Sequence, residues 1–249
     1  LAGSLATATG LLEQALAAPT GAGAGLSAAR TRATVHLARL DILAGRVAHG
    51  RAAAAAGVTA AEGAGDAATA AAWLGVLGLA ELLAGDPSVA AVHFTTVRDA
   101  ALERGDTEPA RTRIDADLVE ALVAAGRLDE AQAALDGFRA RGAAARTPWV
   151  IAAEARCEAL VRTARGEPEA ALVALRAAAA TIESLPLPLE RGRCLLAWGV
   201  ALRAAGRLNA ARAALTTARE AFAALPSPPW EARAVAEMAQ LRKRPAAGS

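Results

Sequence analysis

A five-fold internal repeat of about 40 residues constrains this chain more than any other feature. Each copy is centred on a glycine, and successive central glycines lie 40, 41, 40 and 40 residues apart. A small residue recurs five positions after the glycine, and usually one also stands seven positions before it. An apolar residue, usually large, stands nine positions after it. The central glycines are Gly45, Gly85, Gly126, Gly166 and Gly206. Such regularity indicates a repeat protein.

Each copy reads as two helices joined by a tight turn. The central glycine follows an apolar helical stretch, where a residue in the left-handed conformation commonly ends a helix. Asp86 and Pro87 then supply an N-cap and a proline for the first position of the next helix. The small residues let the two helices approach closely, and the large one fills the space beside them. One hairpin cannot bury its apolar face alone, so neighbouring hairpins must stack.

The predicted fold is therefore all-α, a right-handed superhelical α-solenoid of about five helical hairpins plus end helices. We expect residues 1–25 to be a half-repeat helix and a flexible connection, 26–226 the five hairpins, and 227–249 a capping helix and a disordered tail. The half-repeat start indicates a piece of a longer chain. The expected helix pairs are 26–44 with 47–63, 66–84 with 87–104, 107–125 with 128–141, 148–165 with 168–184, and 188–205 with 208–224, followed by 228–243.

The pattern resembles tetratricopeptide repeats. Around Gly85, the residues Gly78, Ala90 and Phe94 occupy the positions where that family has small, small and aromatic side chains. The repeat length differs from that of the family: it is about 40 residues here, whereas about 34 residues are usual for tetratricopeptide repeats. The resemblance covers residues 26–243 and implies a non-catalytic module that binds a ligand or a protein.

A narrower resemblance rests on residues 188–241. This segment is similar to the helical C-terminal region of large LuxR-type, MalT-like bacterial transcription regulators. Its matching elements are Glu190, Arg191, Leu195, Gly199, Leu202, the turn 205–207, Ala211, Leu215, Ala218, Phe222 and residues 230–234. The resemblance implies a sensor or interaction region with a small-molecule effector or a partner protein or peptide, and it leaves a homo-oligomer open. The alternative is a free-standing scaffold protein that mediates protein–protein interactions.

Composition argues against several other classes of protein. The net charge of +2 is too small to predict nucleic-acid or membrane-surface binding. The apolar stretch 67–85 keeps the repeat period, so we expect a buried helix and not a membrane span. No signal peptide is visible, and the two cysteines, Cys157 and Cys194, are expected to be reduced core residues of a cytoplasmic protein.

We find no motif that predicts catalysis, a cofactor or a metal. The glycines of residues 21–25 lack the lysine of a phosphate-binding loop, and the three histidines lack metal-ligand spacing. Two carboxylate pairs, Asp115 with Asp117 and Asp129 with Glu130, are expected on solvated helix faces. Trp149 and Trp230 lie two periods apart at helix starts and are expected to pack onto the preceding repeat.

The candidate binding residues share one phase on the first helices of the hairpins. In a stacked array, positions about thirteen, ten and six before the turn glycine should line one concave trough. Arginine, a planar donor suited to carboxylate and phosphate groups, occupies these positions in four of the five copies. The candidates are Arg32, Arg39, Arg113, Glu120, Arg156 and Arg193. Two alternatives are a merely solvated face, and a trough made nearly neutral by pairing of Glu120 with Arg113 or Arg156.

Overall fold

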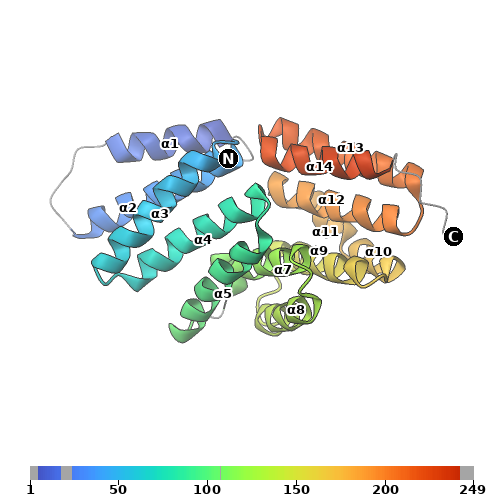
Figure 1. The fold of residues 1–249 in the computed structure, drawn as a ribbon, viewed down its shortest axis with the longest axis horizontal. Coiled ribbons are helices and arrows are strands. Elements are labelled where there is room, and N and C mark those ends of the chain that lie inside the picture. Colours follow the sequence, from blue (N-terminus) through green and yellow to red (C-terminus); the bar gives the residue numbers. More distant parts are fainter. Residues whose placement is uncertain (1–4, 18–23, 107, 242–249) are drawn as a thin grey trace.

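The computed structural model describes residues 5–17, 24–106 and 108–241, which form fourteen helices and no strand (Figure 1). The all-α hairpin array expected from the repeat is confirmed. The predicted connection at 18–23 and the predicted tail at 242–249 lie outside the described residues. The helices are α1 (Leu5–Ala17), α2 (Ala24–Leu43), α3 (Val47–Gly63), α4 (Ala67–Ala84), α5 (Pro87–Glu103), α6 (Pro109–Thr112), α7 (Ile114–Ala124), α8 (Leu128–Gly142), α9 (Pro148–Ala164), α10 (Pro168–Ala177), α11 (Ala179–Ser184), α12 (Pro188–Ala204), α13 (Leu208–Ala224) and α14 (Pro228–Gln240).

The turns inside the hairpins have the predicted geometry. All five central glycines have a positive φ, between 74° and 94°. After Gly85, the side chain of Asp86 accepts a hydrogen bond from the backbone N–H of Val89, and Pro87 opens α5. The glycine therefore ends the first helix and the next two residues begin the second, as their chemistry predicts.

In the second and fifth hairpins, a glycine of the first helix faces the large residue of the second helix. A Cβ atom placed on Gly78 would lie 2.4 Å from Cε1 of Phe94, and one placed on Gly199 would lie 2.6 Å from Cδ2 of Leu215. The residue five positions after each turn glycine also lies where the two helices of the hairpin cross, and in the fifth hairpin this residue, Ala211, is fully buried. The spacing of small and large residues thus sets how closely the two helices pack.

Two predicted helices are each divided into two pieces. The first helix of the third repeat is broken between α6 and α7, where Arg113 has a left-handed φ of 58°, uncommon for a residue with a side chain. The backbone N–H of Arg113 donates to the carbonyl oxygen of Pro109, which closes α6 as a separate turn. The second helix of the fourth repeat is divided at Ala178, between α10 and α11.

The array curls until its last helix meets its first complete hairpin. The Ser227 hydroxyl donates to the backbone carbonyl oxygen of Leu43 at 2.7 Å, although 184 residues separate them. The turn at Gly45 lies against the ring of Pro228. In Figure 1 the red helices α13 and α14 (Pro228–Gln240) lie beside the blue helices of the first hairpin. The concave side is therefore narrowed at this junction and is not an open trough along its whole length.

Several buried residues match their predicted roles. Trp149 packs on Phe138, with ring centroids 6.0 Å apart, and Trp230 packs on Phe222, with centroids 5.7 Å apart.

By length and composition α4 could cross a membrane, yet more than half of it is buried between its neighbours in the array. Its apolar character is explained by this packing.

The helix crossing in the fifth hairpin can be tested with two adjacent residues. We expect Ala211→Arg to lower the free energy of unfolding by several kcal/mol, because a fully buried alanine would be replaced by a long charged side chain. Arg212→Ala is the control, since Arg212 is exposed, and it should change stability by less than about 1 kcal/mol. Urea unfolding followed by circular dichroism measures both; equal midpoints would contradict the packing described here.

A candidate binding site at the ionic cluster

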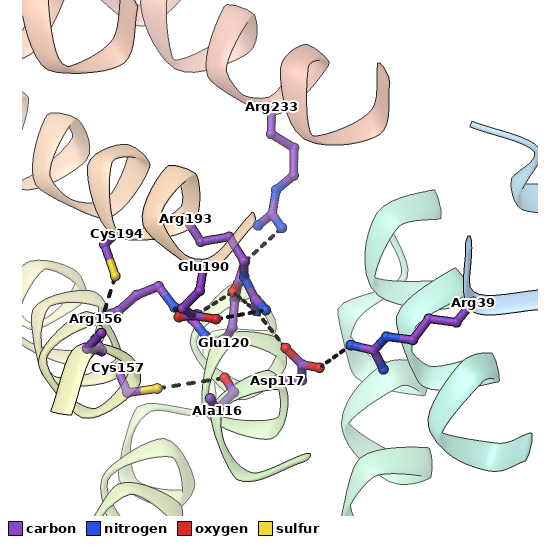
Figure 2. A network of polar contacts seen from close by, with 11 residues as sticks. Arg39, Ala116, Asp117, Glu120, Arg156, Cys157, Glu190, Arg193, Cys194 and Arg233 are labelled. Carbon is purple, nitrogen blue, oxygen red and sulfur yellow. Dashed lines mark hydrogen bonds and ion pairs between the residues drawn. The ribbon is translucent and has the colours of Figure 1, made fainter. Parts of the chain in front are cut away.

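Seven charged side chains meet on the concave side of the array, and we call them the ionic cluster. They come from α2, α7, α9, α12 and α14, so the cluster joins the first complete hairpin to the last helix (Figure 2). The members are Arg39, Asp117, Glu120, Arg156, Glu190, Arg193 and Arg233.

Glu120 is the centre of the cluster. Its carboxylate accepts hydrogen bonds from Nη1 of Arg156 at 2.7 Å, Nη2 of Arg193 at 2.6 Å and Nη1 of Arg233 at 2.7 Å. Burial alone would raise the pKa of Glu120, but the three guanidinium groups outweigh it and hold the pKa well below its usual range. Glu120 is therefore ionised at neutral pH.

Asp117 and Glu190 complete the cluster on either side of Glu120. Asp117 accepts from Nη2 of Arg193 at 2.6 Å, and Arg39 Nη2 lies 3.7 Å from its other oxygen. Glu190 accepts from Nε of Arg156 at 2.6 Å. The Arg39 contact is the one that brings α2 into the cluster, because the other members lie on α7 and later helices.

Two of the guanidinium groups are almost completely buried. Arg156 is 1% exposed and Arg193 is 6% exposed. Burial alone would lower the pKa of each, yet the neighbouring carboxylates raise both pKa values above the usual one. Arg193 also lies over the ring of Trp230, 4.7 Å from its centroid, and Arg233 lies over the same tryptophan at 4.6 Å. These two arginines are therefore fixed by both charge and stacking.

The cluster has more positive than negative groups. Four guanidinium groups, of Arg39, Arg156, Arg193 and Arg233, face three carboxylates. Arg156, Arg193 and the three carboxylates are buried, whereas Arg39 and Arg233 have about a third of their side chains exposed, so the positive excess lies with these two arginines at the edge of the cluster.

Two cavities adjoin the cluster, and Arg193 lines both. The junction cavity, about 260 Å³, is lined by three arginines, two carboxylates and several apolar side chains, among them Trp149 and Leu225; the charged residues are Arg39, Arg113, Arg193, Asp117 and Glu190. The inner cavity, about 320 Å³, is lined by Arg156, Arg193 and Arg233 and by side chains of α9, α12 and α14. The site therefore has two cavities, both partly open to solvent.

The structure brings four of the six predicted binding residues into the cluster: Arg39, Glu120, Arg156 and Arg193. The predicted pairing of Glu120 with Arg156 is present. Arg113 is exposed, lines the junction cavity and lies over the ring of Trp149, 5.3 Å from its centroid. Arg32 lies apart, at a third cavity between α2 and α4. A ligand-binding role for these six residues stays a prediction.

Sequence reasoning missed three members of the cluster: Asp117, Glu190 and Arg233. The predicted solvated face for Asp115 and Asp117 is wrong, because the two residues are only 4% and 2% exposed. Asp115 forms an ion pair with Arg141 of α8. Helical spacing alone places carboxylates on a face of α7, but it does not show that α8, α9 and α12 cover that face.

The cysteines are core residues, as predicted. Cys157 donates to the carbonyl oxygen of Ala116, and Cys194 donates to that of Ala152, in each case on the preceding first helix. Burial raises the pKa of Cys157 to about 12. Within residues 5–17, 24–106 and 108–241, no group of three or more histidine, cysteine, aspartate or glutamate side chains is placed to hold a metal ion.

Removing the charge of Glu120 tests the centre of the cluster. We expect Glu120→Gln to lower the free energy of unfolding by about 3–5 kcal/mol, because three guanidinium groups lose a shared buried counter-charge. The matched control is Glu130→Gln, since Glu130 pairs with Arg127 on the surface with 58% of its side chain exposed. That exchange should leave the unfolding midpoint nearly unchanged, because an exposed ion pair is screened by water. Chemical unfolding at pH 7 compares the two; a similar small loss in both would contradict a central role for Glu120.

The same residue predicts how stability depends on pH. The pKa of Glu120 is lower in the folded chain than its usual value of 4.5. Its contribution to stability is therefore complete above about pH 4.5 and is lost as the pH falls further. Between pH 4.5 and 3 the unfolding free energy of the parent should fall more steeply than that of Glu120→Gln. Parallel slopes in denaturant unfolding across this range would show that Glu120 does not have the lowered pKa.

Comparisons with known proteins agree with the observed architecture. No protein-family model matches the chain, and no curated protein matches it. Among solved structures, it is similar to the nearly identical TPR-like repeats of a kinesin light chain-like protein of Podosopora anserina. The TM-score is 0.56, with 20% identity over 78% of this chain and 95% of that chain. A second structure of those repeats gives 0.55 and 21%, with the same coverage. The chain has the fold of a TPR-like helical-repeat array.

Proposed function

We propose that this chain is a non-catalytic binding module whose binding surface is the concave side around the ionic cluster. The observation that carries the proposal is the excess of one guanidinium group over the carboxylates of the ionic cluster, beside two half-open cavities. A surface of this kind favours a ligand that brings a negative charge, since arginine donates two parallel hydrogen bonds to a carboxylate or a phosphate.

The junction cavity is the first candidate for the ligand. Arg39 and Arg113 line it from α2 and from the break before α7, and neither is fully paired: Arg39 has one ion pair at 3.7 Å, and Arg113 lies over Trp149. The left-handed backbone at Arg113 is strain of the kind that structures keep at ligand-binding positions. A volume of about 260 Å³ suits a small organic anion or one acidic side chain of a partner peptide.

In the finer form of the proposal, the module is the sensor or interaction region of a LuxR-type, MalT-like bacterial regulator in the cytoplasm. The similarity of residues 188–241 to that group supports it, and two buried, reduced cysteines fit a reducing compartment. The effector would be a small molecule or a partner protein, and DNA binding would belong to a domain outside this sequence. The second candidate, a free-standing scaffold for partner proteins, is supported by the repeat fold.

Ligand binding at the junction cavity is tested with a panel of small anionic metabolites and acidic peptides. We expect at least one to bind the parent in isothermal titration calorimetry and to bind Arg113→Ala about tenfold more weakly, through loss of one charged hydrogen bond. Arg111→Ala is the control: it is an exposed arginine two residues away, with 68% of its side chain accessible. It should bind as the parent does. A ligand unaffected by Arg113→Ala, or a panel without any ligand, would contradict this site.

A further inference from the structure

Both ends of the array contribute walls to the junction cavity. Leu5 of α1 and Arg39 of α2 line it from the N-terminal end, and Leu189 of α12 and Leu225 line it from the C-terminal end. Arg113, at the break between α6 and α7, lines it between them. A cavity with walls of this origin keeps its shape only while the two ends of the array stay together.

The direct contact between α2 and α14 is small compared with the contacts inside the hairpins. The hydroxyl of Ser227 donates to the backbone carbonyl oxygen of Leu43, and the ring of Pro228 lies against the turn at Gly45. The repeats of such an array contact mainly their neighbours in the stack. The two ends can therefore separate while every hairpin keeps its own packing.

The charges at the junction oppose its closure. Nη2 of Arg39 lies 3.7 Å from Asp117, a carboxylate that already accepts from Nη2 of Arg193 at 2.6 Å. Burial lowers the pKa of Arg39; Asp117 raises it, and the like charges of Arg193 and Arg113 lower it again. Arg113 forms no ion pair with a described residue. Closing the array thus brings Arg39 towards two other guanidinium groups, with one shared carboxylate between them.

An anion in the junction cavity would reverse this balance. Arg113 is exposed and Arg39 has 31% of its side chain exposed, whereas Asp117 and Glu190, the carboxylates of the lining, are 2% and 6% exposed. An entering molecule therefore meets guanidinium donors, which suit an oxyanion. Since the anion touches walls from both ends only in the closed array, it binds that state more tightly and shifts the population towards it.

We propose that the contact between α2 and α14 is a latch, and that an anion in the junction cavity controls it. Without an anion, repulsion among Arg39, Arg113 and Arg193 favours separation of the two ends; a bound anion neutralises the repulsion and joins them. The closed array is narrowed at the junction, so the latch regulates how a partner reaches the concave side. This inference rests on the proposed function and deepens it by naming its regulation.

The distance between the two ends measures the latch in the full 249-residue chain. Spin labels are placed on Ala48→Cys, just after the turn at Gly45, and on Ala232→Cys, one helical turn after Pro228; both positions are exposed. Double electron–electron resonance gives the distribution of distances. The two native cysteines are buried and burial raises the pKa of both thiols, so they react slowly with the label. Labels on Arg212→Cys and Ala232→Cys do not span the junction and form the control pair.

Two substitutions change the latch without any ligand. Ser227→Ala removes the hydrogen bond to Leu43 and should raise the ratio of open to closed array about fivefold. Its side chain does not cap α14, so the helix keeps its start. Added to Ser227→Ala, Arg113→Glu places an attracting charge beside Arg39 and should restore the closed distance. Arg111→Glu, at an exposed position two residues away, is the matched control and should not.

Sodium sulfate is the anion probe, compared with sodium chloride at the same ionic strength so that charge screening is equal. In Ser227→Ala, sulfate should shift the distances towards the closed value more than chloride does. Adding Arg39→Gln should abolish the difference between the two salts, because the anion loses its contact with α2. Arg32→Gln, an exposed arginine on the same helix at another cavity, should preserve it.

The outcomes separate this inference from the proposed function. Equal distances in the parent, Ser227→Ala and Ser227→Ala/Arg113→Glu would overturn the latch, and so would sulfate that acts no differently from chloride. In either case a compound of the wider panel whose binding depends on Arg113 would leave the proposed function standing. If no compound or peptide of that panel binds and sulfate acts as chloride does, both are overturned.

Discussion

Close packing of the two helices within a hairpin is the constraint on which the array depends, and in two hairpins a glycine on the first helix meets a large residue on the second. Gly78 against Phe94 and Gly199 against Leu215 leave no room for even one more carbon atom. The contact sets the distance between the two helices, and that distance decides which side chains reach the next hairpin. Because interiors are packed without spare volume, the whole stack and its concave side follow from this repeated geometry.

The ionic cluster is a costly feature placed inside that stack. Moving several charges out of water is unfavourable, and buried ion pairs often contribute less stability than apolar side chains of the same size would. Glu120 reduces the cost by serving three guanidinium groups at once. Even so, Arg156 and Arg193 keep donors that no described residue accepts.

Much of the fold could be predicted because its signals are local. A glycine with positive φ ends a helix for steric reasons, and a proline begins the next one, wherever the hairpin lies in the molecule. The candidate site was predicted less well. The regular spacing of arginines on the first helices predicts a shared surface, and Arg39, Arg156 and Arg193 do come together in the ionic cluster. Arg32 shares the phase but lies at another cavity, and Asp117 was assigned to solvent although three later helices cover it.

The sequence by itself determined the hairpins, their period, their turns and the small and large residues at each crossing, because those depend on neighbours within about 20 residues. Only the tertiary structure decided that the array curls until Ser227 reaches Leu43, and that Arg39 meets Asp117 near Arg193 and Arg233. The closure results from small rotations between successive hairpins that add up along the array. Each rotation depends on side-chain packing between neighbouring repeats, which the sequence of one repeat does not show. The charge balance of the ionic cluster depends on this closure, because the closure brings Arg39 and Arg233 to the same group of carboxylates.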